Sequence, residues 1–195
     1  ADSQDEGREG ELDMNAPRFE AILNYADAVR RAAEMDTFPL DAEELVRRLG
    51  GKLNKRQPGE PTQEIKVHAR VLPGEGMSFT LDPVRYHDET LNRFAIVKIL
   101  GNLLLHTTYM KDRGLTQEFS SDPARHGVAC LHMCHESDLF AYATLMPQGL
   151  FCKVAELHIV NSSHNTHAIG AHFGVRPRHV QTYGRILATF RWGDR

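Results

Sequence analysis

Residues 93–106 read Arg-Phe-Ala-Ile-Val-Lys-Ile-Leu-Gly-Asn-Leu-Leu-Leu-His, and this stretch decides how the rest of the chain is interpreted. Its apolar side chains recur at the spacing of one face of an α-helix. The pattern extends in both directions and predicts a helix from residue 88 to about residue 110, with Gly114 beyond its end. The apolar positions of this helix are Leu91, Phe94, Ala95, Ile99, Leu103 and Leu104.

Helical patterns also lie before and after this stretch. Asp41 followed by Glu44 resembles a capping box, which marks a helix start. Asp122-Pro123 is another start signal, because proline is favoured at the first position of a helix. The helices expected besides 88–110 cover about 17–35, 41–49, 122–145, 149–159, 165–173 and 177–190.

One segment alternates with the period of a β-strand. From Glu64 to Leu72, apolar and polar side chains point in opposite directions, and residues 73–76 form a turn. Residues 77–81 continue as a second strand. The sequence therefore predicts a small antiparallel sheet with one buried face, and an α+β fold that is mostly helical. The alternating apolar residues are Ile65, Val67, Ala69 and Val71, then Met77, Phe79 and Leu81.

Composition indicates an ordinary globular protein with an uneven charge distribution. Of the 195 residues, 41% are hydrophobic and 25% are charged, which excludes a collagen-like, low-complexity or wholly disordered chain. The net charge of −3 excludes a chain that is basic throughout, as many nucleic-acid binders are. Residues 1–13 carry six acids against one base, whereas residues 153–195 carry a net charge of +4. Residues 1–15 are expected to be a disordered acidic tail.

Cysteine usage and hydropathy bear on the cellular compartment. An odd count of three cysteines favours a reducing, cytoplasmic setting over a disulfide-stabilised one. No apolar run approaches the roughly 20 residues that span a membrane, so no membrane association is expected. The first thirteen residues are acidic and do not read as a signal peptide.

Three segments together resemble the ImmA/IrrE family of zinc metallopeptidases. The active-site helix of that family typically reads R-F-x-x-A-H-E-L-G-H, and residues 93–102 are similar to it. Residues 136–147 look like its later helix, whose leading Glu is the third zinc ligand, and residues 169–180 are similar to its C-terminal segment. The resemblance covers about residues 17–190. It implies a zincin-like domain over 16–147, followed by a C-terminal helical segment over 148–195.

The zinc motif itself is degenerate. In H-E-x-x-H, two His at i and i+4 bind the ion and the Glu activates the attacking water. The matching positions here hold Lys98, Ile99 and Asn102, and only the third-ligand position, Glu136, is retained. A lysine ammonium has no lone pair to donate, and without zinc nothing lowers the pKa of the water. We therefore expect no catalytic residues, no cofactor and no peptidase activity at these positions.

The loss of zinc would leave the carboxylate of Glu136 buried and without a partner, which is costly. The ammonium of Lys98 stands where the first His ligand would be. We therefore expect an internal Lys98–Glu136 ion pair, which Asn102 could complete. The alternative is that Lys98 lies on a solvated helix face.

A different zinc site is the alternative that keeps enzymatic activity. Cys130 and Cys134 are four residues apart and would share one face of a helix, and His106 could complete the set. In this alternative the chain is a zinc-dependent peptidase with a non-standard metal site. The competing interpretation is that the two cysteines are buried and act as small hydrophobic residues.

The C-terminal helices have the spacing of a helix-turn-helix-like hairpin, with the turn at residues 174–177. The outer face of its second helix could contact DNA in the manner of a recognition helix. The competing interpretation is a helical hairpin that only closes the core. The candidate DNA contacts are Arg178, Gln181, Thr182 and Arg185, with His179 on the same face.

The resemblance also suggests a biological role. Members of the family often lie beside a helix-turn-helix repressor in phages and mobile elements, and relieve repression by cleaving it. The first hypothesis is therefore an inactive regulatory protein that binds such a repressor-like protein partner. It would use the groove around Lys98, Asn102 and Glu136 and an exposed strand edge within 64–82. The second hypothesis is a DNA-binding transcription regulator that acts through the C-terminal helices.

Overall fold

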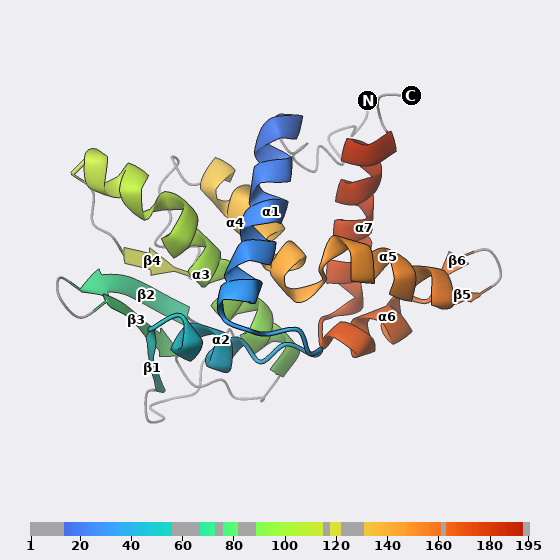
Figure 1. The fold of residues 1–195 in the computed structure, drawn as a ribbon, viewed down its shortest axis with the longest axis horizontal. Helices are drawn as coiled ribbons and strands as arrows, with labels where there is room; N and C mark the ends of the chain where they lie inside the picture. The colour runs from blue at the N-terminus through green and yellow to red at the C-terminus, as the bar shows by residue number, and fades with distance from the viewer. Residues whose placement is uncertain are drawn as a thin grey trace, which may run out of the picture.

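The computed structural model shows a mostly helical α+β fold (Figure 1). The structure describes residues 14–55, 67–72, 76–81, 89–114, 118–121, 131–160 and 163–192. The helices are α1 (Ala16–Ala32), α2 (Ala42–Arg48), α3 (Glu89–Asp112), α4 (Leu131–Leu145), α5 (Gln148–Leu157), α6 (Thr166–Phe173) and α7 (Pro177–Trp192). The strands are β1 (Lys52–Lys55), β2 (Val67–Leu72), β3 (Gly76–Leu81), β4 (Glu118–Ser120), β5 (Ile159–Val160) and β6 (Ser163–His164).

The main sheet has the strand order β1-β3-β2-β4. The predicted hairpin is confirmed, because β2 and β3 pair antiparallel with Val67 opposite Leu81. The prediction of a purely antiparallel sheet is wrong, since β1 pairs with β3 in parallel. The hairpin also lies in the interior of the sheet, because β4 pairs with the edge of β2 that faces away from β3. The expected free edge within 64–82 is therefore wrong for the described strands, and the edge strands there are β1 and β4.

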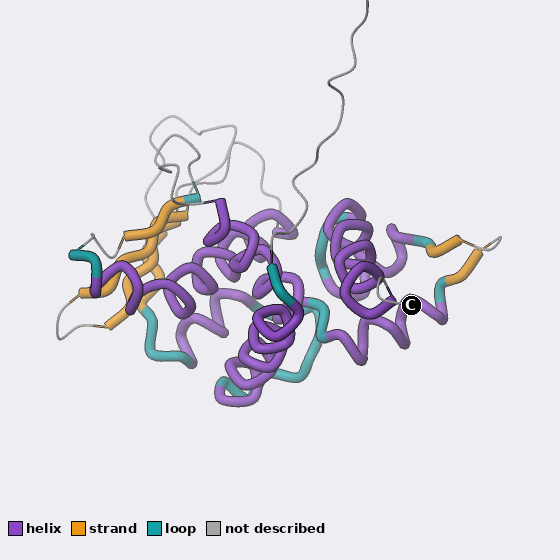
Figure 2. The backbone as a smooth tube through the Cα atoms, turned by 90° about the horizontal axis from the view of Figure 1, so that it is seen from above, coloured by secondary structure: helices purple, strands orange, loops and turns teal. Residues whose placement is uncertain are grey.

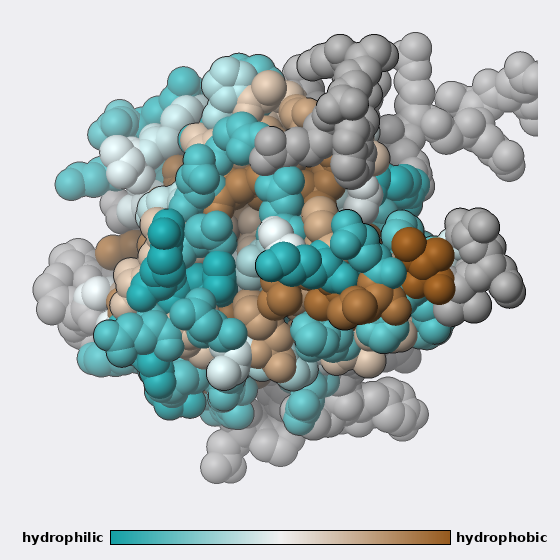
Figure 3. Space-filling model, turned by 45° about the vertical axis from the view of Figure 1, so that its right-hand side comes forward, coloured by the Kyte–Doolittle hydropathy of each residue, from teal (hydrophilic) through white to brown (hydrophobic). Residues whose placement is uncertain are grey.

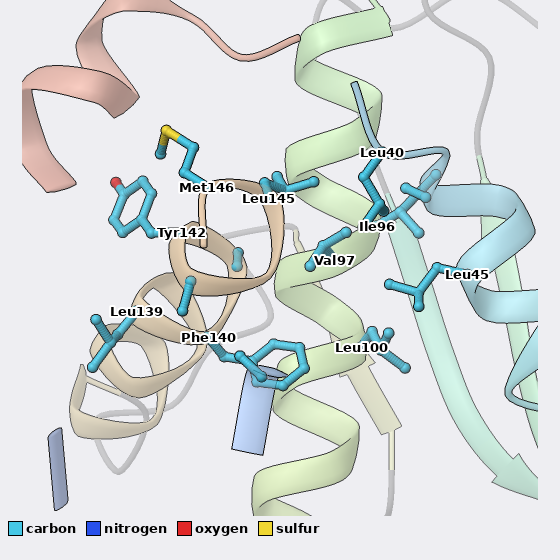
Figure 4. Packing of buried hydrophobic residues seen from close by; sticks show 14 of the residues in the cluster. Leu40, Leu45, Ile96, Val97, Leu100, Leu139, Phe140, Tyr142, Leu145 and Met146 are labelled. Carbon is cyan, nitrogen blue, oxygen red and sulfur yellow. The ribbon is translucent and has the colours of Figure 1, made fainter. Parts of the chain in front are cut away.

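Helix α3 lies at the centre of the fold, between α4 and the elements at the sheet end of the molecule. Its most extensive packing is with α4, and α4 in turn packs against α1. Figure 4 shows the central apolar residues of α3 with α4 on one side and α2 on the other. The buried side chains at this junction are Leu40, Leu45, Ile96, Val97, Leu100, Phe140 and Leu145.

A glycine sets the distance between α3 and α4. A Cβ on Gly101 would lie 2.7 Å from a ring carbon of Phe140, so only glycine allows the two helices to approach this closely. Asn102, the next residue along α3, therefore meets Ser137 of α4 at short range. This contact brings together the positions that the sequence analysis singled out.

Local signals account for the helix starts that the sequence predicts. The side chain of Asn15 accepts a hydrogen bond from the backbone N–H of Arg18 and so caps α1. Asp41 accepts from the N–H groups of Glu43 and Glu44, both at 3.0 Å, as a capping residue does. The prediction of a disordered tail over 1–15 is wrong for Met14 and Asn15, because Met14 packs against the core and Asn15 caps α1, while residues 1–13 lie outside the described residues. The predicted start at 122–123 also lies outside them.

The C-terminal elements form the other end of the molecule. Figure 2 shows the main sheet at one end and the hairpin of β5 and β6 at the opposite end. Helices α6 and α7 pack against each other across a turn at Gly174, whose φ of 64° is a left-handed conformation that suits glycine. The ring of Phe190 in α7 stacks on Phe19 in α1 with centroids 4.2 Å apart. No helix within the described ranges is both long and apolar enough to cross a membrane.

Candidate functional site

Helices α3 and α4 bring polar residues together in an otherwise apolar interface, and we call this group the α3–α4 polar cluster. Asn102 is only 2% exposed, and its Oδ1 accepts a hydrogen bond of 2.7 Å from Ser137 Oγ. Ile99 is fully buried in the hydrophobic core, and its side chain can act neither as an acid nor as a base. The cluster consists of Lys98, Asn102 and His106 on α3 with Glu136, Ser137 and Asp138 on α4.

Glu136 is paired with an arginine that the sequence analysis did not single out. Arg18 of α1 donates from Nε to one carboxylate oxygen at 2.7 Å and from Nη2 to the other at 2.5 Å. This is the two-pronged geometry in which guanidinium binds carboxylate most strongly. The hydrogen bond to Glu136 raises the pKa of Arg18, although burial opposes it. Both oxygens of Glu136 are thus bound by a cation of the protein itself.

Lys98 has a different partner from the predicted one. Its Nζ lies 2.7 Å from Oδ1 of Asp138. The predicted Lys98–Glu136 ion pair is therefore wrong, and the alternative of a merely solvated Lys98 is wrong as well, because the side chain is about three-quarters buried. The physical reason is that residues two apart on a helix point in different directions. Glu136 faces α1 and Arg18, while Asp138 faces Lys98.

The Asp138 side of α4 connects to α7. Burial raises the pKa of Asp138, and the nearby Lys98 partly offsets this effect. Burial and the charge of Asp138 raise the pKa of Tyr142, one turn further along α4. Thr182 of α7 lies beside Tyr142 and partly offsets this rise in its pKa. A polar path therefore runs from α3 through α4 to α7.

His106 is a buried imidazole beside Glu136. It is 6% exposed, and its Nε2 lies 3.7 Å from Oε2 of Glu136 without a hydrogen-bond partner of its own. Burial lowers the pKa of His106, and the charge of Glu136 opposes this shift. The positive charge of Arg18 lowers it further. The ring is therefore neutral at pH 7.

The residues at the positions that resemble the zinc motif do not fit a zinc ion. Lys98 presents a cation, Ile99 has no donor atom, and Arg18 already binds both oxygens of Glu136. Within the described part of the chain, no three His, Cys, Asp or Glu side chains form a group that could hold a metal. The alternative zinc set stays a prediction, because Cys130 lies outside the described residues. Cys134 is a half-buried thiol on α4.

The predicted DNA contacts are divided between the two faces of α7. Arg178, Gln181 and Arg185 are exposed, and we call these three residues the outer face of α7. Thr182 is half-buried and faces Tyr142. The prediction for His179 is wrong, because its ring is buried and stacks on Phe94 with centroids 4.0 Å apart.

The end of the molecule that carries β5 and β6 also exposes aliphatic side chains. Leu157 is 80% exposed and Ile159 is 53% exposed. Figure 3 shows apolar surface gathered beside polar side chains on this side of the molecule. Neither residue was singled out from the sequence, where both fall within a predicted helix of ordinary apolar pattern.

Comparisons with known proteins give a likeness in fold. No family model matches the chain, and no curated protein matches it. Among solved structures, a Mycobacterium tuberculosis transcriptional regulator is similar, with a TM-score of 0.53 and 16% sequence identity. The match covers 83% of this chain and 45% of that chain, so this chain spans less than half of that protein's length. At this identity the likeness shows a shared fold and nothing more specific.

Proposed function

We propose that this chain is a catalytically inactive regulatory protein of the ImmA/IrrE kind, with a zincin-like body. The observation that carries the proposal is the bond between Arg18 and Glu136. A zinc metallopeptidase needs an open position for the metal ion beside its carboxylate ligand. Two histidine ligands and a Glu that acts as the general base must face that position. Here the guanidinium occupies both carboxylate oxygens, and Lys98 and Ile99 replace ligand and base.

The proposed partner is a repressor-like protein, as in the regulation of phages or mobile elements. The resemblance in sequence motifs and the fold shared with a transcriptional regulator both support a role in transcription. An extended segment of the partner could pair with an edge of the main sheet. Among the described strands, β4 is the edge next to α3, and it replaces the hairpin as the proposed binding edge.

Two measurements test the proposal. Elemental mass spectrometry on chelator-washed protein is expected to find far less than one zinc per chain. Capture experiments with wild-type protein are expected to recover a DNA-binding repressor, and no cleaved form of it should accumulate. A stoichiometric zinc ion or cleavage of the captured protein would contradict the inactive assignment.

DNA binding through α7 is a second candidate function, and a specific observation favours it. No Asp or Glu occurs between residues 157 and 193, a stretch that contains four arginines. Three polar or basic side chains of this stretch form the exposed outer face of α7, spaced so that they share one side of the helix. Phosphate contacts from such residues supply much of the affinity for DNA.

Charge reversal distinguishes the two candidates. The double variant Arg178→Glu/Arg185→Glu should lose DNA binding in a fluorescence anisotropy assay but keep a protein partner bound elsewhere. The matched control is Lys111→Glu/Arg113→Glu, which reverses two exposed cations at the C-terminal end of α3, on another helix. Equal DNA affinity of the two double variants would contradict binding through α7.

A further inference from the structure

The outer face of α7 is a basic surface on a helix whose opposite side is buried. Val180, Tyr183 and Leu187 anchor that opposite side in the core. The exposed side has no acidic neighbours along α6 or α7, because residues 157–193 contain no Asp or Glu. Such a surface attracts anionic groups of any origin within about one Debye length, roughly 8 Å at physiological ionic strength.

The start of α1 lies against the C-terminal half of α7. Phe19 stacks on Phe190 with an interplanar angle of 6°, and Figure 1 shows the first turn of α1 beside the last turns of α7. Asn15 caps α1 at this point, so residues 1–13 are joined to the fold beside α7. An extended segment of that length reaches up to about 45 Å. The 16 residues of α7 span only about 24 Å.

We propose that residues 1–13 dock on the outer face of α7 and compete with nucleic acid for it. This inference rests on the second candidate function and adds its regulation. Residues 1–13 carry six acids and one base, a net charge of −5. The acidic segment and the basic face are therefore complementary in charge. The segment is joined to the fold near Phe190, and its extended reach exceeds the length of α7, so it can reach the outer face at an effective concentration on the order of millimolar.

The competition is electrostatic and therefore weakens with salt. Neutralising the six acids should strengthen DNA binding about 5- to 10-fold at 50 mM salt, and the gain should shrink as salt screens the contact. The full-length test variant replaces Asp2, Asp5 and Asp13 by Asn, and Glu6, Glu9 and Glu11 by Gln. The readout is fluorescence anisotropy with a labelled duplex of about 20 base pairs at 50, 150 and 300 mM salt.

Two controls separate docking from a general change in net charge. Exchanging Asp for Glu and Glu for Asp at the six positions keeps the charge and should leave the affinity unchanged. The pair Glu11→Gln/Asp13→Asn should also strengthen binding more than the pair Glu118→Gln/Asp112→Asn. The second pair removes the same charges at the sheet end of the molecule. Equal gains from both pairs would overturn the proposal.

A readout without DNA keeps the docking testable if DNA binding through α7 fails. The chain has one tryptophan, Trp192, at the C-terminal end of α7. Energy transfer from Trp192 to a dansyl group on the N-terminal amine should fall when salt is raised from 50 to 500 mM. The neutralised variant and Arg178→Glu/Arg185→Glu should show low transfer at both salt concentrations. High transfer that is independent of salt and of these substitutions would overturn docking on this face.

Discussion

The half-buried carboxylate of Glu136 explains why its partner is a cation. A half-buried carboxylate without a partner costs several kcal/mol in desolvation, and a metal ion or a positively charged side chain offsets that cost. Arg18 is suited to this role because its planar guanidinium meets both oxygens at once. Lys98 offers a single ammonium, and it lies opposite Asp138 instead.

Removal of the guanidinium should therefore destabilise the fold. Arg18→Ala is expected to lower the free energy of unfolding by about 1–2 kcal/mol, discounted because Arg18 is 42% exposed. Arg18→Lys should recover only part of this loss, since it cannot bind both oxygens. Urea denaturation measures the effect, with the exposed Arg31→Ala as the matched control. A change no larger than that of the control would show that the pair is not stabilising.

His106 predicts a dependence of stability on pH. Because the pKa of His106 is lowered in the folded protein, the unfolded chain binds the proton first as pH falls below about 6.5. The contribution of His106 to stability is thus complete above this pH and is lost as pH falls through the interval below it. Urea denaturation at pH 7.5 and pH 5.0 should show a smaller loss for His106→Gln than for wild type. The exposed His167→Gln should lose as much as wild type, and identical losses for all three proteins would contradict the prediction.

At the scale of elements, regular patterns were predicted and short ones were not. The long helical apolar patterns of α1, α3 and α7 and the alternation of β2 and β3 are strong signals, and the structure confirms these elements. Strands β1 and β4 are four and three residues long and do not alternate, so they were missed, and with them the parallel pairing. Of the α3–α4 polar cluster, the motif in the sequence identifies Lys98, Asn102 and Glu136. Arg18 carries no motif, and only the packing of α1 on α4 shows its role.

The close approach of α3 and α4 depends on Gly101. Gly101→Ala places a Cβ 2.7 Å from Phe140, a buried ring that cannot move away freely, and should cost about 1–3 kcal/mol of stability. Gly149→Ala in α5 is the matched control, because nothing lies within 4 Å of its added Cβ. That control should be neutral or slightly stabilising, since alanine favours helices. Thermal unfolding of both variants measures these effects. An unchanged stability of Gly101→Ala would mean that α3 and α4 are not packed at this distance.

At the scale of the whole molecule, the cluster is closed by an element far away in the sequence. Arg18 and Glu136 are 118 residues apart, and α1 crosses α4 to bring them together. The same helix begins beside the C-terminal end of α7, the helix that carries the basic outer face along residues 178–185. Helix α1 thus connects the α3–α4 polar cluster with the C-terminal helices. The polar path through Asp138 and Tyr142 makes a second connection between the same two regions.

This arrangement predicts what a metal site at these positions would need. The double variant Lys98→His/Asn102→His places two imidazoles at i and i+4 on α3, and together with Glu136 these are the ligand types of a zinc peptidase. With Arg18 in place the carboxylate remains engaged, so zinc should bind weakly. Adding Arg18→Ala frees both oxygens, and zinc affinity should rise at least about tenfold, measured by titration calorimetry on metal-free protein. Circular dichroism before and after loading verifies that each variant is folded. Equal zinc affinities with and without Arg18 would mean that the α1 helix does not close the site.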